Sequence, residues 1–321
     1  ATTLADYRDR YALHKSDPAL QAAHAACPWA VTWDDHEVQN DYAGGTNAQA
    51  DAAAFLTQRA AAWQAFYENM PLRATALAGA QFDRLQVYRR LPWGRLAQLH
   101  LLDDRQHRAL QACRKPGATN AGSVRPADCA ELADPARSLL GPAQEQWLGE
   151  GLAADAKHDH TRWSVLAQQT LFSPRRYPSG QVAADGWDGY PAARERLLQS
   201  VQRHSPRNTV LLGGDIHQNY VCNVHAPGAG GDRPVLASEF CGTSISSRAG
   251  TTQDKVDAIA RHNPHVLLAR CEERGYGLAD ITPEQWTTTL RAVDNPLDPH
   301  SSAHTLARFV VQDRKPGPVR A

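Results

Sequence analysis

The 321-residue sequence lacks several features that would assign a chain to a simple class. Neither charge is in excess, because 34 Lys and Arg balance 34 Asp and Glu. This balance does not favour nucleic acid or an anionic membrane as the main partner. No apolar run approaches the roughly 20 residues that span a bilayer. With 42% apolar and 21% charged residues, the composition is that of a globular chain able to bury a core.

Methionine is scarce and no initiator residue is present. Met70 is the only Met, and the chain begins ATTLADYRDRYALHKSD, without a signal-like apolar stretch. Such a start is typical of a processed protein or of the inner part of a longer one.

Cysteine is sparse, and its spacing disfavours a structural zinc site, because none of the six cysteines forms a CxxC pair. Cys113 and Cys129 flank the Gly/Pro-rich loop RKPGATNAGSVRPAD. They are either two unrelated thiols or a disulfide, and we expect the disulfide. It would stabilise a loop of this length by about 3 kcal/mol and would indicate an oxidising compartment.

No repeat, low-complexity tract or linker divides the chain. Apolar periodicity predicts helices over residues 3–26, 47–78, 141–156 and 190–204. Strand-like runs cover residues 82–94, 95–104, 161–172, 208–215, 219–226 and 235–244, and residues 304–317 read as one further strand. Helices interleaved with short apolar strands predict an α/β or α+β fold with a sheet core and helices outside.

The stretch WAVTWDDHEVQNDYAGG, residues 29–45, joins a strand-like apolar run to a dense group of ionisable side chains. Four of them are consecutive, Asp34, Asp35, His36 and Glu37. Groups this close perturb one another's pKa unless something compensates their charge. Either a metal ion binds here, since carboxylates and imidazole are suitable ligands, or the stretch is a solvated turn that caps a helix.

Two further strand ends carry similar chemistry. Asp103, Asp104 and Arg105 follow LAQLHLL, and Asp215 and His217 follow VLLGG. Residues two apart share a face of an extended segment, so we expect Asp215 and His217 to be placed for metal binding. The guanidinium of Arg105 suits a phosphate group, and the alternative is a surface ion pair with Asp103 or Asp104.

These strand ends offer no evident serine or cysteine nucleophile. Carboxylates, histidines and an arginine without such a nucleophile indicate metal-activated water. A bound metal lowers the pKa of water and stabilises the charge that develops on a phosphoryl group. The residues therefore favour metal-dependent hydrolysis of phosphate esters.

Several segments together resemble the PhoD-type alkaline phosphatases of the calcineurin-like metallophosphoesterase superfamily. The resembling segments run from end to end of the chain: TLADYRDRYALHKSDPALQAAHAACPW, WAVTWDDHEVQNDYAG, LLDDRQHR, LGPAQEQWL, WSVLAQQT, WDGYPAARERLL, LLGGDIHQNYV and EFCGTSISS. The resemblance implies an α/β fold with a two-sheet β-sandwich core flanked by helices. It also implies an exported enzyme, periplasmic or extracellular, that hydrolyses phosphomonoesters and some phosphodiesters.

Carried over position by position, DDHE resembles the Gly-Asn-His-Glu motif of the superfamily. Asp35 then falls on the metal-ligating Asn, and Asp34 falls on the Gly. His36 falls on the His that contacts phosphate and protonates the leaving group. GGDIH resembles the Gly-His-x-His motif, which implies that Asp215 and His217 bind two different metals.

The resemblance further implies that Asn40 and Arg105 hold phosphate oxygens. The implied metals are calcium and iron(III), with other divalent metals possible, and the implied substrates are small-molecule phosphate esters. Cys27 and Cys241 lie where the family usually has apolar residues, so we expect both in the core.

The family also has an upstream cysteine and a Gly-Asp-x-x-Tyr segment that complete the metal site. Neither is found in this sequence, and the family's N-terminal domain is also missing. We therefore expect residues 1–321 to form one catalytic domain without those parts. The alternative is a non-catalytic remnant that binds metal or phosphate.

Overall fold

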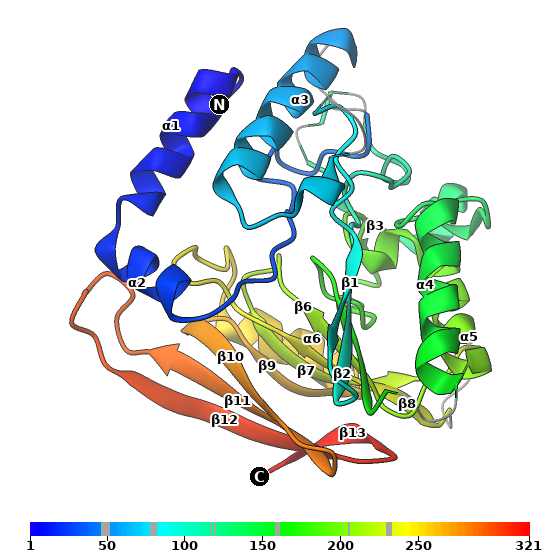
Figure 1. Ribbon diagram of the computed structural model, residues 1–321. Coiled ribbons are helices and arrows are strands. Elements are labelled where there is room, and N and C mark those ends of the chain that lie inside the picture. The colour runs from blue at the N-terminus through cyan, green and yellow to red at the C-terminus, as the bar shows by residue number, and fades with distance from the viewer. Residues whose placement is uncertain are drawn as a thin grey trace.

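The core of the protein consists of two β-sheets packed face to face, with helices outside them (Figure 1), and a further two-stranded sheet pairs β3 (Ser123–Val124) with β5 (Val182–Ala183). This arrangement confirms the expected two-sheet sandwich flanked by helices. The computed structural model describes residues 1–45, 52–77, 82–115, 117–118, 120–157, 161–204, 206–228 and 233–321. None of the helices in these ranges has the length and apolar character needed to cross a membrane.

The larger sheet has seven strands in the order β1-β2-β4-β6-β8-β7-β9. Their bounds are β1 Arg89–Trp93, β2 Ala97–Leu101, β4 Trp163–Ala167, β6 Thr209–Gly213, β7 Asn219–His225, β8 Val235–Cys241 and β9 Val266–Arg270. β2, β4, β6 and β8 are parallel, whereas β1, β7 and β9 pair antiparallel with their neighbours. The carboxyl ends of the parallel strands therefore meet at one edge, where α/β folds place their binding sites.

Two helices cover one face of the larger sheet, α4 (Pro142–Ala156) and α5 (Pro191–His204) (Figure 1). Their leucines form one buried cluster with Leu166 of β4 and Leu211 of β6. Both helices begin with proline, which loses no hydrogen bond at the first helical position. The helices predicted over residues 141–156 and 190–204 are confirmed.

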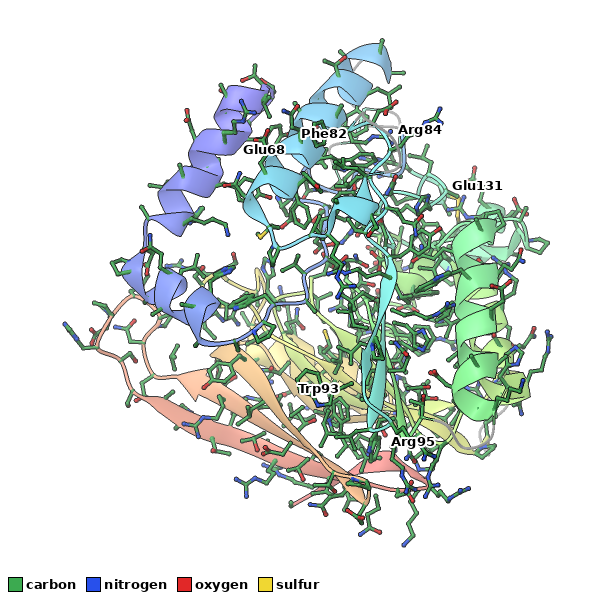
Figure 2. All side chains as sticks on the ribbon, viewed as in Figure 1. Glu68, Phe82, Arg84, Trp93, Arg95 and Glu131 are labelled. Atoms are coloured by element: carbon green, nitrogen blue, oxygen red, sulfur yellow. A yellow bond between two sulfur atoms is a disulfide. The ribbon has the colours of Figure 1, made fainter. Side chains whose placement is uncertain are left out.

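The smaller sheet packs on the opposite face and is an antiparallel meander. Its strands are β10 Arg274–Ile281, β11 Gln285–Val293, β12 Ala303–Gln312 and β13 Lys315–Arg320. Trp286 of β11 and Phe309 of β12 pack against Trp163 and Phe240 of the larger sheet. Side chains fill the space between the two sheets (Figure 2).

The single strand predicted over residues 304–317 is wrong, because β12 and β13 form a hairpin there. Gln312 pairs with Lys315, so Asp313 and Arg314 make a two-residue turn. Arg314 has a φ of 59°, the left-handed conformation that such tight turns require. Asp-Arg is not a residue pair typical of these turns, which explains why the sequence gives no signal.

Three helices lie toward the N-terminus, α1 (Leu4–Lys15), α2 (Pro18–Ala26) and α3 (Ala52–Asn69). The helical stretch predicted over 3–26 is confirmed, but it forms two helices, since the chain breaks before Pro18, which cannot continue a helix. The helix predicted over 47–78 is confirmed only for α3, and parts of that stretch lie outside the described residues. Arg8 of α1 pairs with Glu68 of α3 at 2.6 Å (Figure 2).

The remaining elements are short, apart from one amphipathic helix. They are η1 Ala74–Ala76, β3 Ser123–Val124, η2 Pro126–Asp128, η3 Ala130–Ala133, β5 Val182–Ala183, η5 Trp187–Gly189 and α6 Gln253–His262. The stretch 29–33, expected as a strand, forms none. Side chains donate hydrogen bonds to its carbonyl groups instead. Arg89 donates to the carbonyl oxygen of Val31 at 2.8 Å, and Gln169 donates to that of Trp33 at 2.9 Å.

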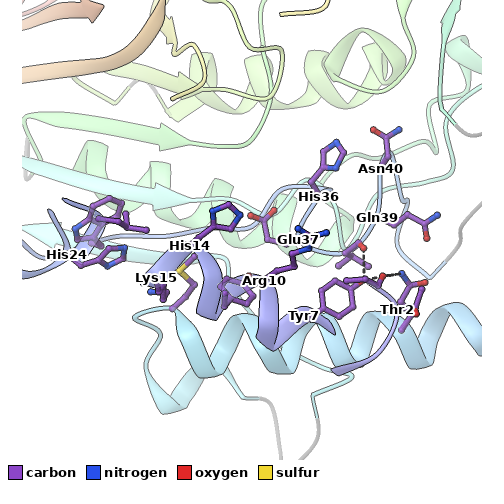
Figure 3. A pocket seen from close by; sticks show the side chains of 17 residues that line it. Thr2, Tyr7, Arg10, His14, Lys15, His24, His36, Glu37, Gln39 and Asn40 are labelled. Carbon is purple, nitrogen blue, oxygen red and sulfur yellow. Dashed lines mark hydrogen bonds between the residues drawn. The ribbon is translucent and has the colours of Figure 1, made fainter. Parts of the chain in front are cut away.

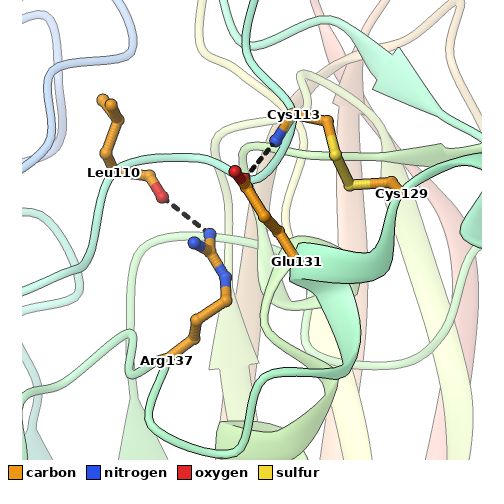
Figure 4. The surroundings of a disulfide bond; sticks show 5 residues. All are labelled: Leu110, Cys113, Cys129, Glu131 and Arg137. Carbon is orange, nitrogen blue, oxygen red and sulfur yellow. Dashed lines mark hydrogen bonds between the residues drawn. A yellow bond between two sulfur atoms is a disulfide. The ribbon is translucent and has the colours of Figure 1, made fainter.

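The expected disulfide between Cys113 and Cys129 is present (Figure 4). Beside it, the carboxylate of Glu131 accepts a hydrogen bond from the backbone N–H of Cys113 at 2.7 Å. Cys241 is buried as expected. The prediction that Cys27 lies in the core is wrong, because this residue caps the end of α2 and is exposed.

Candidate metal and phosphate site

Three chain segments that carry acidic residues meet at the carboxyl edge of the larger sheet. The first contains Asp34 and Asp35, the second leaves β2 through Arg105, and the third leaves β6 through Asp215. One carboxylate oxygen from each of Asp34, Asp35 and Asp215 lies within 4.8 Å of the other two. Carboxylates far apart in the sequence therefore converge, and we call these three residues the acidic cluster.

The guanidinium of Arg105 lies against this cluster and is completely buried. Its Nε donates to Asp34 at 2.5 Å, its Nη1 to Asp185 at 2.6 Å and its Nη2 to Asp215 at 2.8 Å. The alternative of a surface ion pair is therefore wrong. Arg105 is an internal cation whose closest partners come from three different segments.

Asp185 and Arg108 belong to the site but were missed in the sequence. Asp185 follows β5 and contacts both guanidiniums, that of Arg105 at 2.6 Å and that of Arg108 at 2.8 Å. Arg108 is buried and also donates to the carbonyl of Tyr42. In the sequence, the Asp-Gly pair of AADGWDGY reads only as a turn, and nothing in its spacing relates it to the other strand ends.

Asp35 is 3% exposed, and its carboxylate fixes the turn that follows it. The backbone N–H groups of His36 and Asp41 donate to its two oxygens, both at 2.8 Å. The Glu37 carboxylate accepts from the backbone N–H of Asp34 at 2.7 Å. The stretch is thus a turn, but Asp35 is buried and no helix begins within residues 34–45, so the solvated helix cap is wrong. The burial of Asp35 agrees with a ligand-binding role.

Asp104 is fully buried, and neither of its carboxylate oxygens has a hydrogen-bond partner among the described residues. The Nε of Arg105 lies 3.7 Å away. Burial raises the pKa of Asp104 to about 7, and the positive charge of Arg105 offsets only part of this effect. A buried carboxylate without a donor is a group that a cation would stabilise.

Burial dominates the electrostatics of the other acids as well. It raises the pKa of Asp34 and Asp215, against the lowering effect of Arg105. Burial also disfavours ionised Asp185, but Arg105 and Arg108 outweigh it and hold the pKa of this carboxyl below its ordinary value. Carboxylates outnumber the guanidiniums around them, and such an excess of hard oxygen donors fits divalent or trivalent metal ions.

His217 is not part of the acidic cluster, and the extended segment that was expected to place it on one face with Asp215 does not form. Asp215 and His217 have φ values of 67° and 55°, and the segment is therefore left-handed at both residues rather than extended. The Nδ1 of His217 contacts the carbonyl oxygen of Arg248 at 2.8 Å. Of Asp215 and His217, Asp215 is the residue that contacts Arg105.

His36 and Asn40 are exposed and line a cleft of about 940 Å³ between the turn and helices α1 and α2 (Figure 3). The cleft has an aromatic and apolar wall together with basic side chains. The apolar residues include Tyr7, Tyr11, Leu20, Trp29 and Met70, and the basic ones are Arg10, His14, Lys15 and His24. The structure thus places His36 and Asn40 beside a space that can receive a small molecule.

Comparisons with known proteins identify the family of the chain. A family profile described as PhoD-like phosphatase matches residues 1–290. Alkaline phosphatase D of Bacillus subtilis (strain 168) is 40% identical over 322 residues, which cover 98% of this chain and 52% of that protein. The chain therefore spans about half the length of this curated relative.

A solved structure described as that of PhoD superposes with a TM-score of 0.89 at 38% sequence identity. The superposition covers 100% of this chain and 60% of the other. Sequence and structure lead to the same assignment: the chain belongs to the PhoD-like phosphatase family.

Proposed function

We propose that the protein hydrolyses phosphate esters with metal ions held at the acidic cluster. The observation that carries this proposal is the convergence of Asp34, Asp35 and Asp215 from separate segments beside the buried guanidinium of Arg105. Membership of the family supports the reaction class and favours an enzyme over a non-catalytic remnant.

The donor set decides which metals fit. We propose Asp35 and Asp215 as metal ligands, with Asp34 beside them, and His217 as a further ligand implied by the resemblance. Carboxylate oxygens suit calcium, and iron(III) is the second metal that the resemblance implies. When bound, such ions supply positive charge for the phosphoryl group and lower the pKa of a coordinated water.

The protein's own groups would act on the phosphate ester. Arg105 would stabilise the negative charge that builds up on the phosphoryl group through its nearby positive charge, because its buried nitrogens already donate to three aspartate carboxylates. Asn40 contributes an amide from the edge of the cleft, and exposed His36 donates a proton to the leaving-group oxygen. The cleft in Figure 3 would receive the leaving group of a small-molecule ester.

The disulfide supports a location outside the cytoplasm. Disulfides such as Cys113–Cys129 persist mainly in oxidising compartments. We therefore propose that the protein is periplasmic or extracellular.

Hydrolysis of an aryl phosphate tests the proposal. We expect turnover with calcium and iron(III), its loss after chelation, and a fall of at least about 10²-fold in Asp215→Asn. Asp280→Asn is the matched control, because Asp280 is exposed on β10 and should leave turnover unchanged. Full turnover in chelator, or in Asp215→Asn with unchanged metal content, would reject the metal-dependent mechanism.

A further inference from the structure

One buried residue, Gln169, contacts all three segments of the candidate site, two of them through its side-chain amide and the third through its backbone carbonyl. Gln169 lies just beyond β4 and is 5% exposed. Its side-chain nitrogen donates to the carbonyl oxygens of Trp33 at 2.9 Å and Leu102 at 3.0 Å. Its side-chain oxygen accepts from the backbone N–H of Asp104 at 3.2 Å. The backbone carbonyl oxygen of Gln169 accepts a hydrogen bond from the backbone N–H of Gly214 at 2.8 Å.

In each segment, one of these contacts lies immediately before a charged residue of the site. Trp33 precedes Asp34, Asp104 precedes Arg105, and Gly214 precedes Asp215 in the sequence. A shift of Gln169 would therefore change the distances between the carboxylates and the guanidinium directly.

Regular secondary structure contributes little to holding the three segments at these points. Residues 29–33 belong to no strand, and Asp215 lies beyond the end of β6 in a left-handed conformation. Close approach of the third segment depends on Gly213, where a Cβ atom would lie 2.1 Å from the carbonyl oxygen of Thr170. The amide of Gln169 thus supplies a link that the β-ladders do not.

Gln169 is itself held firmly. The loop that follows it is fixed by the buried carboxylate of Glu239, which accepts from the backbone N–H groups of Phe172 at 2.6 Å and Ser173 at 2.8 Å. A rigidly placed amide can impose a position on more mobile partners.

We propose that Gln169 is a positioning residue that sets the spacing of the Asp34, Arg105 and Asp215 segments, and through it the cation affinity of the acidic cluster. Only the link to cation affinity rests on the proposed function. The position needs both a donor and an acceptor, since its nitrogen faces oxygens and its oxygen faces an N–H. Glutamate would place a second acceptor against two carbonyl groups, and methionine would leave all of these partners unpaired.

The test compares Gln169→Glu and Gln169→Met with a matched control, Asn263→Asp. Asn263 is 3% exposed, and its amide bonds the backbone of Arg176 and Ile259 in a similar donor-and-acceptor arrangement. Amide hydrogen exchange is measured on the metal-free protein. We expect exchange to rise about ten-fold or more at Asp104 in both Gln169 variants. Gly214, whose N–H bonds the backbone carbonyl that both variants keep, should be unchanged, as should β11 and β12.

The control and a milder variant complete the experiment. Asn263→Asp should lower the melting temperature without changing exchange at Asp104 or Gly214. If a Gln169 variant does not fold, Thr32→Val replaces it, because Thr32 Oγ1 accepts from Gln169 at 2.8 Å and valine keeps the side-chain shape. A smaller rise in exchange at Asp104 is then expected.

Titration with terbium(III), an oxygen-seeking stand-in for calcium, measures the effect on the acidic cluster. We expect affinity to fall about ten-fold or more in the Gln169 variants and to stay unchanged in Asn263→Asp. Unchanged exchange at Asp104, a uniform rise across the protein, or unchanged terbium affinity overturns the proposal. A wild-type chain that binds no cation contradicts the proposed function, while the exchange pattern still decides the positioning role.

Discussion

At the scale of single residues, burial without a partner makes Asp104 the most informative carboxyl. Its pKa rises from 3.8 to about 7 through burial, so the folded protein binds this proton more tightly than the unfolded chain. The wild type should therefore lose stability as pH rises between these two values. Above a pH of about 7, the folded protein bears the full free-energy cost of burying the charged carboxylate.

Asp104→Asn removes this titration. In chelator, the variant should gain stability over the wild type as pH rises from about 4 to about 7, at about 1.4 kcal/mol per pKa unit, and the gain should then level off. Urea unfolding at several pH values measures it, with exposed Asp280→Asn as a flat reference. A difference that does not change with pH would contradict the pKa assigned to Asp104.

His36 is expected to act on the leaving group, because it is exposed at the edge of the cleft. In the metal-loaded protein, His36→Ala should lower turnover of an alkyl phosphate by about 10²–10⁴-fold, as loss of a general acid does. The loss should be smaller for a nitrophenyl ester, whose leaving group needs no proton. Exposed His300→Ala serves as the control. Equal losses on both esters would rule out proton donation.

Arg105 compensates buried carboxylates on several segments, so its removal should be costly. Arg105→Met should destabilise the metal-free protein by about 3–5 kcal/mol, because it leaves carboxylates buried without their cation. Calcium should restore part of the loss, since it binds the folded form. Thermal unfolding with and without calcium checks this, and exposed Arg95→Met at the β1–β2 turn should change nothing (Figure 2). Wild-type stability of Arg105→Met in chelator would contradict the role of Arg105 as an internal cation.

At the scale of elements, the disulfide takes the place of regular structure in the loop between β2 and α4. It joins residues 16 positions apart around β3 and short 3₁₀ turns, where few backbone ladders form. Replacing both Cys113 and Cys129 by serine should lower the free energy of unfolding by about 3 kcal/mol. Cys27→Ser, at an exposed thiol, should change it little. Guanidinium unfolding of both variants gives the comparison, and equal stabilities would assign the disulfide no structural role.

At the scale of the whole molecule, the sequence predicts the larger sheet better than the smaller one. Every strand run predicted between residues 82 and 244 contains a strand of the larger sheet, because buried parallel strands are short, apolar and bounded by turns. No element was predicted over 245–303. There β10 carries two glycines, and Gly275 lies so close to β11 that a Cβ atom would meet the carbonyl oxygen of Arg291 at 1.9 Å. Such a strand owes its place to tertiary pairing rather than to its own pattern.

In the candidate site, too, some residues could be predicted from the sequence and others could not. Asp35, Arg105 and Asp215 follow apolar runs, and those positions alone suggested that they meet. Asp185 comes from a loop, and its meeting with Arg105 depends on chain path rather than on local pattern. The displacement of His217 depends on two left-handed residues that linear spacing does not reveal. The roles of His36, Asn40 and His217 stay predictions.

The completely buried guanidinium of Arg105 has a consequence for how the protein matures. A site built only of carboxylates would repel itself until a metal arrived, and folding would then have to wait for the metal. Here the chain carries its own counter-ion, which contacts Asp34, Asp185 and Asp215. We therefore expect folding and metal acquisition to be separate events. On this expectation, the chain can reach its final shape in one place and acquire metals later, in another.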